Sequence, residues 1–154
     1  MGAVSERPWA FTHIDEVRFS DLDVMGHLNN VAFLQFVESA RVGYVRSLLP
    51  GHDPSRAGSF GGMVAHAEID YRAPGHLGDR IETRIRPTVL GRTSLGLEFE
   101  MRIDERVIAQ GNSTLVLWDR DAARPLPIPP LLRERLAADG GRERDAAPAP
   151  LTKL

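Results

Sequence analysis

Hydrophobic residues recur at helical spacing in one long segment of the chain and at alternate positions in five others. The helical segment reads NNVAFLQFVESARVGYVRSLLP, and its start has Asn29 or Asn30 available as a cap. Pro50 and Gly51 mark its end. Its first turns are apolar nearly all round, which predicts a helix buried on most of its surface. The apolar positions at helical spacing are Val31, Leu34, Val37, Ala40, Val45 and Leu48, with Ala32, Phe33 and Phe36 on a second side.

Alternation of apolar and polar residues predicts strands over 11–19, 63–73, 79–90, 93–103 and 106–118. One apolar face per strand favours an antiparallel sheet that is packed on one side only. In the 63–73 segment the alternation places Met63 and Ala65 on the apolar face and Val64 on the opposite face with His66. A proline-rich bend and a short helix follow the last strand, in PLPIPPLLRERL.

These elements imply an α+β domain with one central helix. The apolar face of the sheet needs a cover, and one helix alone is long and apolar enough to supply it. We therefore expect a curved antiparallel sheet wrapped around that helix. The length of 154 residues favours a single domain, which we place at 11–136, after an N-terminal arm at 1–10. Residues 137–154 hold few large apolar side chains and are expected to be a disordered tail.

Composition narrows the possible functions. The formal net charge of −2 lacks the basic footprint of nucleic-acid binding, so no nucleic-acid partner is expected. The chain has no cysteine, which removes disulfides, thiol catalysis and cysteine-ligated zinc. No apolar run is long enough for a membrane span or a secretory signal. A cytoplasmic protein is the expectation.

The stretch FSDLDVMGHLNNVAF at 19–33 crowds small polar residues against the start of the helix. It begins like a calcium-binding EF-hand loop, with Asp21, Asp23 and Gly26 at the first, third and sixth positions. The fifth position is Met25, however, and the twelfth, where calcium needs a bidentate glutamate, is Ala32. No calcium site is expected.

Two other interpretations of this stretch remain. Adding His27 gives a possible Asp/Asp/His set for a transition metal, but only the spacing supports it, and we expect no metal. The stretch is otherwise a helix entry, in which polar side chains satisfy free backbone N–H groups. The same free N–H groups can polarise a carbonyl oxygen, and a carboxylate just before the helix can act as general base or nucleophile. An acid followed by an open helix start is thus a minimal acyl-transfer site.

RFSDLDVMGHLNNVAFLQFVESAR resembles the D-x-D-x-x-G-H-x-N-N…E-x-A-R signature of the 4-hydroxybenzoyl-CoA thioesterase-like branch of the hot-dog superfamily. VAHAEIDYRAPGHLGD, LGRTSLGLEFE and PLPIP are also similar to that branch, so the resemblance covers residues 11–135. It implies a hot-dog fold with five or six strands around the helix. It also implies hydrolysis of acyl-CoA thioesters without a cofactor, in a homodimer or homotetramer with active sites at the subunit interface.

The resemblance also implies roles for individual residues. Asp23 matches the catalytic carboxylate, and the backbone N–H of Asn30 matches the group that polarises the thioester carbonyl. Gly26 allows close approach of the substrate, and His27 orients Asp23 or contacts the substrate. The remaining substrate contacts are Arg92, Thr93 and Ser94 for the CoA phosphates and Gly62, Met63 and Val64 on the strand that lines the acyl channel.

Several alternatives stay open at the level of sequence. Asp21 is interpreted as structural, and Glu38 and Arg41, three apart on the helix, as a structural ion pair. An acyl-carrier-protein thioesterase would have the same core site. A non-catalytic acyl-CoA-binding module is a third possibility. The sequence fixes neither the length nor the aromaticity of the acyl group.

Overall fold

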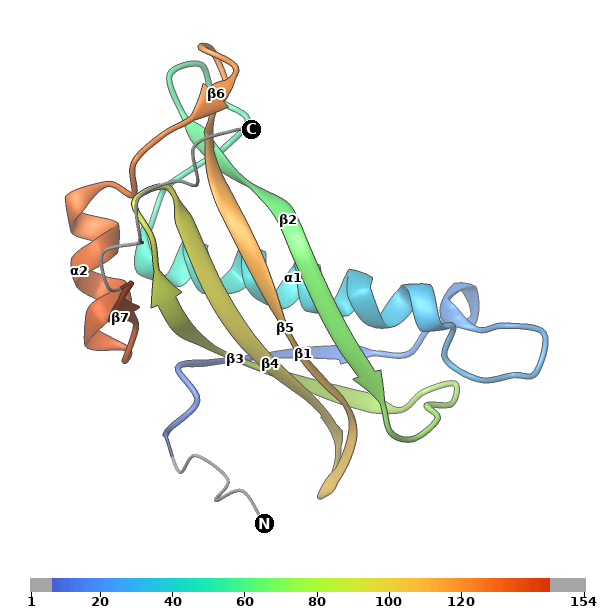
Figure 1. Cartoon of the computed structure of the whole chain (residues 1–154). Helices are drawn as coiled ribbons and strands as arrows, with labels where there is room; N and C mark the ends of the chain where they lie inside the picture. The colour runs from blue at the N-terminus through green and yellow to red at the C-terminus, as the bar shows by residue number, and fades with distance from the viewer. Residues whose placement is uncertain (1–6, 145–154) are drawn as a thin grey trace, which may run out of the picture.

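A computed structural model of the chain describes residues 7–144, which form one curved antiparallel sheet and two helices (Figure 1). The five long strands lie in the order β1-β3-β4-β5-β2, and each pairs with its neighbours in antiparallel fashion. Two short strands extend the sheet, β6 beside β5 and β7 parallel to β3. The elements in chain order are β1 (Phe11–Glu16), the 3-10 turn η1 (Phe19–Asp21), α1 (Asn30–Leu48), β2 (Phe60–Tyr71), β3 (Arg80–Leu90), β4 (Ser94–Ile103), β5 (Arg106–Asp119), β6 (Arg124–Pro125), α2 (Pro130–Ala138) and β7 (Arg142–Glu143).

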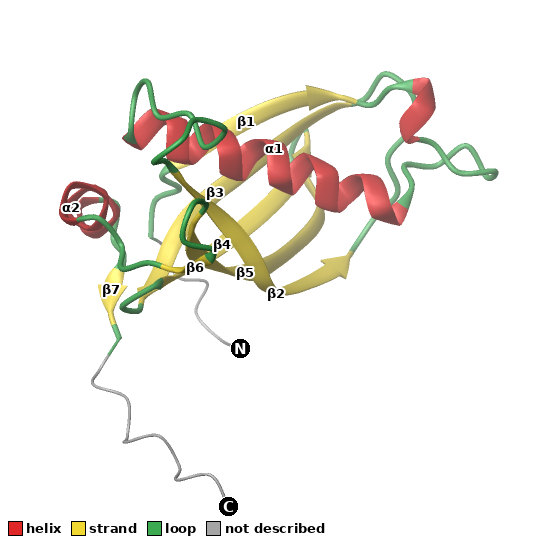
Figure 2. Ribbon diagram, turned by 90° about the horizontal axis from the view of Figure 1, so that it is seen from above, coloured by secondary structure: helices red, strands yellow, loops and turns green. Residues whose placement is uncertain are grey.

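Helix α1 lies across the concave face of the sheet, as Figure 2 shows from above. The side chain of Asn29 caps the helix by accepting a hydrogen bond of 3.0 Å from the N–H of Val31. One side of the helix supplies six buried residues to the core: Ala32, Phe33, Phe36, Val37, Ala40 and Tyr44. The predicted α+β fold, with a sheet wrapped around one long helix, is therefore confirmed. Neither helix in the described residues has the length and apolar character needed to cross a membrane.

Alternate residues of β3, β4 and β5 face the helix and complete the core, as their sequence pattern predicts. The close contact between β5 and β2 depends on Gly111. A Cβ atom at this position would lie 1.9 Å from the carbonyl oxygen of Glu68 and 2.8 Å from the Cζ atom of Phe99. No side chain fits there without movement of the β2 backbone.

The alternation predicted for β2 is wrong at its start. The register with β5 shifts between Val64 and His66, so that Ala65 is an extra residue in a β-bulge. Val64 pairs with the buried Leu115 and shares the inner face of the sheet, whereas the sequence pattern placed it outside. The alternation of apolar and polar residues along the sequence cannot reveal the extra residue.

The C-terminal segment packs against the end of the sheet. Leu132 and Leu136 of α2 are buried, and the hydroxyl of Tyr44 donates a 2.6 Å hydrogen bond to the carboxylate of Asp139. The expected tail begins at residue 137, yet α2 continues to Ala138 and β7 pairs with β3. Residues 145–154 of that expected tail, and residues 1–6 of the expected arm, lie outside the described residues.

Candidate active site

The stretch before α1 folds into a small hairpin-like loop. Leu22 and Leu28 form an isolated antiparallel bridge, which brings the two ends of the loop together. Inside it, the N–H of Asp23 donates to the carbonyl of His27 (2.8 Å), and the N–H of Gly26 donates to the carbonyl of Asp23 (3.0 Å). Gly26 has a φ of +75°, a conformation that side-chain-bearing residues rarely adopt. The main chain therefore determines the shape of this loop.

Asp21 anchors the loop to the body of the protein. Its side chain is only 4% exposed and pairs with Arg18 through contacts of 3.0 and 3.1 Å to the guanidinium and 2.9 Å to the backbone N–H. The hydrogen bonds from Arg18 hold the pKa of Asp21 below its usual range. The carbonyl of Asp21 also accepts a 2.8 Å hydrogen bond from the N–H of Asn29. Asp21 has the contacts of a structural residue, in line with its interpretation from sequence.

The carboxylate of Asp23 is held by one of its two oxygens. Its Oδ1 atom accepts hydrogen bonds from the backbone N–H groups of Met25 (2.8 Å) and His27 (3.1 Å). Among residues 7–144, no donor contacts the Oδ2 atom. Asp23 does not cap α1, because Asn29 does so. Its carboxylate is therefore fixed in position and leaves one oxygen open.

The start of α1 leaves a backbone donor open as well. Within the described part of the chain, the N–H of Asn30 has no acceptor. Its carbonyl, in contrast, accepts a 3.1 Å hydrogen bond from the hydroxyl of Tyr71, whose ring packs edge-on against Phe33 at 5.1 Å. Sequence reasoning treated Tyr71 only as a strand residue, and no signal in the sequence joins it to Asn30. Tyr71 ties the end of β2 to the first turn of the helix.

A groove runs between α1 and the exposed strand β2 from this helix start. Its volume near the helix start is about 260 Å³, and its lining includes Val31, Leu34, Val64 and Ala67. Ser113, which is only 4% exposed, also lines this groove, and its hydroxyl has no hydrogen-bond partner in the described residues. The groove continues along the helix to an apolar stretch beside Gly62. An elongated apolar group fits such a channel.

The other predicted residues of the first loop take distinct places. A Cβ atom at Gly26 would meet nothing within 4 Å, so the space beside it is open. The ring of His27 packs edge-on against the ring of His76, with centroids 5.2 Å apart. The contact between His27 and Asp23 runs through the backbone N–H instead of the ring. Asp23, Gly26 and His27 thus lie in the loop closed by Leu22 and Leu28, and Asn30 follows this loop at the first position of α1.

Gly62 and Val64 of the predicted acyl channel line the groove, whereas the predicted CoA residues lie elsewhere in this single chain. Arg92, Thr93 and Ser94 form the turn between β3 and β4, and Ser94 lies in register with Val116, which in turn pairs with Met63. This end of the sheet is opposite the end where Tyr71 meets Asn30. Since α1 has 19 residues and rises about 1.5 Å per residue, the two ends are roughly 28 Å apart. One chain alone does not join Asp23 to Arg92, Thr93 and Ser94.

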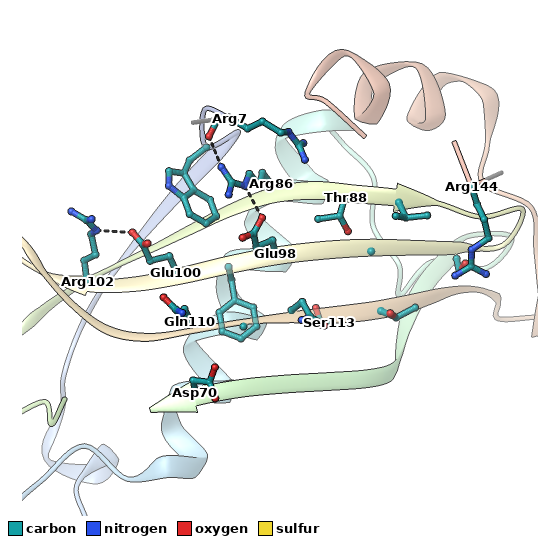
Figure 3. A pocket seen from close by; sticks show the side chains of 18 residues that line it. Arg7, Asp70, Arg86, Thr88, Glu98, Glu100, Arg102, Gln110, Ser113 and Arg144 are labelled. Carbon is teal, nitrogen blue, oxygen red and sulfur yellow. Dashed lines mark hydrogen bonds and ion pairs between the residues drawn. The ribbon is translucent and has the colours of Figure 1, made fainter. Parts of the chain in front are cut away.

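A larger hollow of about 900 Å³ lies on the outer face of the sheet, away from α1 (Figure 3). Two arginines of its lining are paired with glutamates: Arg86 contacts Glu98 at 2.8 Å, and Arg102 contacts Glu100 at 2.6 Å. The ring of Trp9 covers Arg86 at 4.2 Å. These ion pairs lie on the outer face of the sheet, away from Asp23 and the start of α1. Within residues 7–144, no group of three or more His, Cys, Asp or Glu side chains is placed to hold a metal ion.

Comparison with known proteins identifies the family. The profile of the thioesterase-like superfamily matches residues 17–136. The chain belongs to the thioesterase-like superfamily. Its solved relatives are hot-dog thioesterases, so the fold is a hot-dog fold and the family chemistry is thioester hydrolysis.

Among solved structures, a thioesterase of Thermus thermophilus complexed with coenzyme A and Zn is 36% identical, with a TM-score of 0.72; the match covers 84% of this chain and 93% of that one. A thioesterase superfamily protein of Jannaschia is 27% identical, with a TM-score of 0.77, over 86% of this chain and 84% of that one. The 1,4-dihydroxy-2-naphthoyl-CoA hydrolase of Synechococcus elongatus is 26% identical over 123 residues, which span 78% of this chain and 90% of that protein.

Proposed function

We propose that this thioesterase hydrolyses an acyl-CoA thioester to the free acid and CoA, with Asp23 as general base or nucleophile. The observation that carries the proposal is the pairing of an anchored carboxylate with an open backbone donor. Asp23 has one oxygen fixed by two N–H groups and the other open, and the N–H of Asn30 at the helix start has no acceptor among the described residues. These are the two groups that acyl transfer requires.

The thioester carbonyl would lie with its oxygen at the N–H of Asn30, where the positive end of the helix dipole stabilises a developing oxyanion. In the general-base route, Asp23 takes a proton from water as the water oxygen bonds to the carbonyl carbon. The C–S bond then breaks and CoA leaves as the thiolate. In the nucleophilic route, Asp23 bonds to the carbonyl carbon, and the C–S bond breaks with departure of the CoA thiolate. Water then hydrolyses the resulting mixed anhydride, which releases the acid and restores the Asp23 carboxylate. A thiol has a pKa of about 8.5, so the leaving group needs no strong general acid.

We propose further that the active unit is a homodimer in which two β2 edges face each other. β2 is a twelve-residue edge strand in which Met63 and Val64 are about half exposed, and the neighbouring helix exposes Val31 and Val42 to a similar degree. Long, apolar, unpaired edges are rare in stable monomers because they template association. A second copy of the chain would cover this surface.

Such a dimer would also complete the site. Within one chain, Asp23 and the turn holding Arg92 lie at opposite ends of the sheet. Antiparallel pairing of two β2 strands places the start of one beside the end of the other. The β3–β4 turn of one copy would then lie near the catalytic loop of its partner, which is the Asp23-bearing loop closed by Leu22 and Leu28. Substrate binding between subunits follows from this arrangement, with one copy supplying the carboxylate and the other the phosphate contacts.

Thiol release from a panel of short, long and aromatic acyl-CoA substrates tests the proposed activity. Activity on at least one of them is expected, while failure on every member would refute it. Comparison with the same acyl groups on acyl-carrier protein separates the two kinds of thioesterase. Tight acyl-CoA binding without turnover would instead favour a binding module.

Sedimentation analysis of Met63→Lys tests the dimer, with Leu131→Lys as a control because Leu131 is exposed to a similar extent (49% against 52%) on α2. Dissociation is expected for Met63→Lys alone. A wild-type monomer at micromolar concentration would contradict the proposed assembly.

A further inference from the structure

The turn between β3 and β4 directs its carbonyl groups into the protein. The carbonyl of Arg92 accepts a 2.9 Å hydrogen bond from the N–H of Ile128, and the carbonyl of Thr93 accepts one of 2.8 Å from the N–H of Leu117. The N–H groups of Arg92 and Thr93 have no acceptors in the described residues. Backbone donors without partners, next to an exposed arginine, are a favourable place for an anion.

Arg133 of α2 connects this turn to the C-terminal segment. Its Nη2 atom donates to the carbonyl of Gly91 at 2.6 Å, and its Nη1 atom contacts both carboxylate oxygens of Glu143 at 2.9 and 2.7 Å. The buried Leu132 beside it fixes the helix against the core. Because Glu143 neutralises its charge, Arg133 is suited to hold the turn in place and is not a free cation.

The segment after α2 brings another arginine to the same place. Gly140, with a φ of +96°, lets the chain reverse after the helix, and β7 then pairs with the end of β3. The backbone N–H of Arg144 donates to the carbonyl of Leu90 at 2.9 Å, directly before the turn. Figure 3 shows the side chain of Arg144 over the end of the sheet where β4 begins. The side chains of Arg92, Arg133 and Arg144 line one surface hollow of about 690 Å³.

The charges around this hollow favour an anion. The guanidinium groups of Arg92 and Arg144 have no ion-pair partner within residues 7–144, whereas Arg133 and Glu143 neutralise each other. Among the described residues, two unpaired cations and two open N–H groups therefore surround one turn. A phosphate group, with several acceptor oxygens and a negative charge, matches this donor set.

We propose that the C-terminal segment completes the phosphate-binding end of the CoA site, with Arg144 as a direct phosphate contact and Arg133 as a positioning residue for the β3–β4 turn. The inference rests on the proposed acyl-CoA hydrolase function and assigns roles to two residues outside the catalytic loop. The turn alone supplies one cation. The packing of α2 and β7 against it supplies a second cation and keeps the turn in shape.

Substrates with and without the nucleotide test this inference on the full chain. The measured quantity is the ratio of kcat/KM for an acyl-CoA to kcat/KM for the corresponding acyl-pantetheine, which lacks the phosphates. For Arg144→Ala we expect this ratio to fall about fivefold to tenfold, through KM and not kcat, because one charge-assisted contact is lost at a solvent-exposed site. Its dependence on ionic strength should weaken in parallel, since salt screens exposed charges. The matched control is Arg80→Ala, an arginine exposed to 67% at the opposite end of β3.

Arg133→Lys separates positioning from charge. Lysine keeps the positive charge but lacks the planar fork that reaches both Gly91 and Glu143. A similar fall in the ratio, with kcat retained, is expected if Arg133 positions the turn. An unchanged ratio in Arg144→Ala would overturn the phosphate contact, and an unchanged ratio in Arg133→Lys would overturn the positioning role.

Calorimetric titration with free CoA keeps the two proposals distinguishable. If the wild-type protein hydrolyses no thioester but binds CoA, and Arg144→Ala weakens that binding about fivefold or more, the phosphate site stands and the hydrolase function fails. If hydrolysis is observed and CoA binds equally to the wild type, Arg144→Ala and Arg80→Ala, the hydrolase function stands and the phosphate site is refuted.

Discussion

Replacement of Asp23 by asparagine separates a catalytic carboxylate from a structural one. Asparagine keeps the oxygen that accepts the N–H groups of Met25 and His27, so both hydrogen bonds of 2.8 and 3.1 Å can persist. Only the charge is lost. Hydrogen bonds to charged acceptors are worth about 1 kcal/mol more than those to neutral ones, and exposure reduces this. We therefore expect Asp23→Asn to lower the free energy of unfolding by about 1 kcal/mol or less.

The same change should affect catalysis far more. A positioned general base contributes about 10²- to 10⁴-fold to rate. At 1.36 kcal/mol per tenfold, kcat should fall by the equivalent of about 3–5 kcal/mol of transition-state stabilisation. Urea unfolding measures the stability, and a thiol-release assay with an active acyl-CoA measures the rate.

Asp119 supplies the matched control. Its Oδ1 atom also accepts two backbone N–H groups, from Asp121 at 3.0 Å and Ala122 at 2.9 Å, in the turn after β5. Asp119→Asn should show the same small loss of stability with no loss of kcat. Equal activity of Asp23→Asn and wild type, or equal losses of kcat in the two variants, would refute the catalytic role of Asp23.

Three further predictions concern stability. The lowered pKa of Asp21 means that its pairing with Arg18 stabilises the fold fully above the unfolded pKa of about 4 and less as pH falls through the lower folded value. Asp21→Asn should therefore cost about 1–3 kcal/mol near neutral pH and converge with wild type in strong acid, measured by urea unfolding across pH. Gly111→Ala should cost about 2–3 kcal/mol or more, seen as a lower Tm, since its Cβ would overlap the β2 backbone. Tyr44→Phe should cost about 1–2 kcal/mol in urea unfolding by removing the hydrogen bond to Asp139.

Each of these has a result that would contradict it. A stability difference between wild type and Asp21→Asn that stays constant from neutral to acid pH would contradict the ion-pair account. A wild-type Tm for Gly111→Ala would mean that β2 moves freely. An effect of Tyr44→Phe that disappears when Asp139 is already replaced by alanine confirms the pairwise contact, and equal effects in both backgrounds exclude it.

The sequence predicts the elements of this fold well because their signals are local. The helix begins at Asn30 behind its Asn29 cap and ends before Pro50, where the cap and the breaker residues place it. The four later strands follow the alternation of apolar residues to within a few positions. The bulge at Ala65 is the exception. The extra residue exchanges the two faces of the strand, but the composition of the strand gives no sign of it.

The candidate site is predictable only in part, because only some of its contacts join residues that are close along the chain. Asp23, Gly26 and Asn30 lie within eight positions along the chain, so their clustering is visible in the sequence. Tyr71 reaches the helix start from 41 positions away, and Arg133 reaches the β3–β4 turn from a similar separation. Such contacts depend on tertiary packing, and no spacing rule in a single sequence predicts them.

The loop that holds Asp23 leaves two of its side chains free to vary. Val24 is fully exposed and Met25 is 73% exposed, while the hydrogen bonds that shape the loop come from the main chain and from Asp23. Substitutions of Val24 and Met25 should therefore leave the position of Asp23 unchanged. Under the proposed mechanism, the loop combines a carboxylate that must stay constant with two neighbouring positions that can change without loss of the fold.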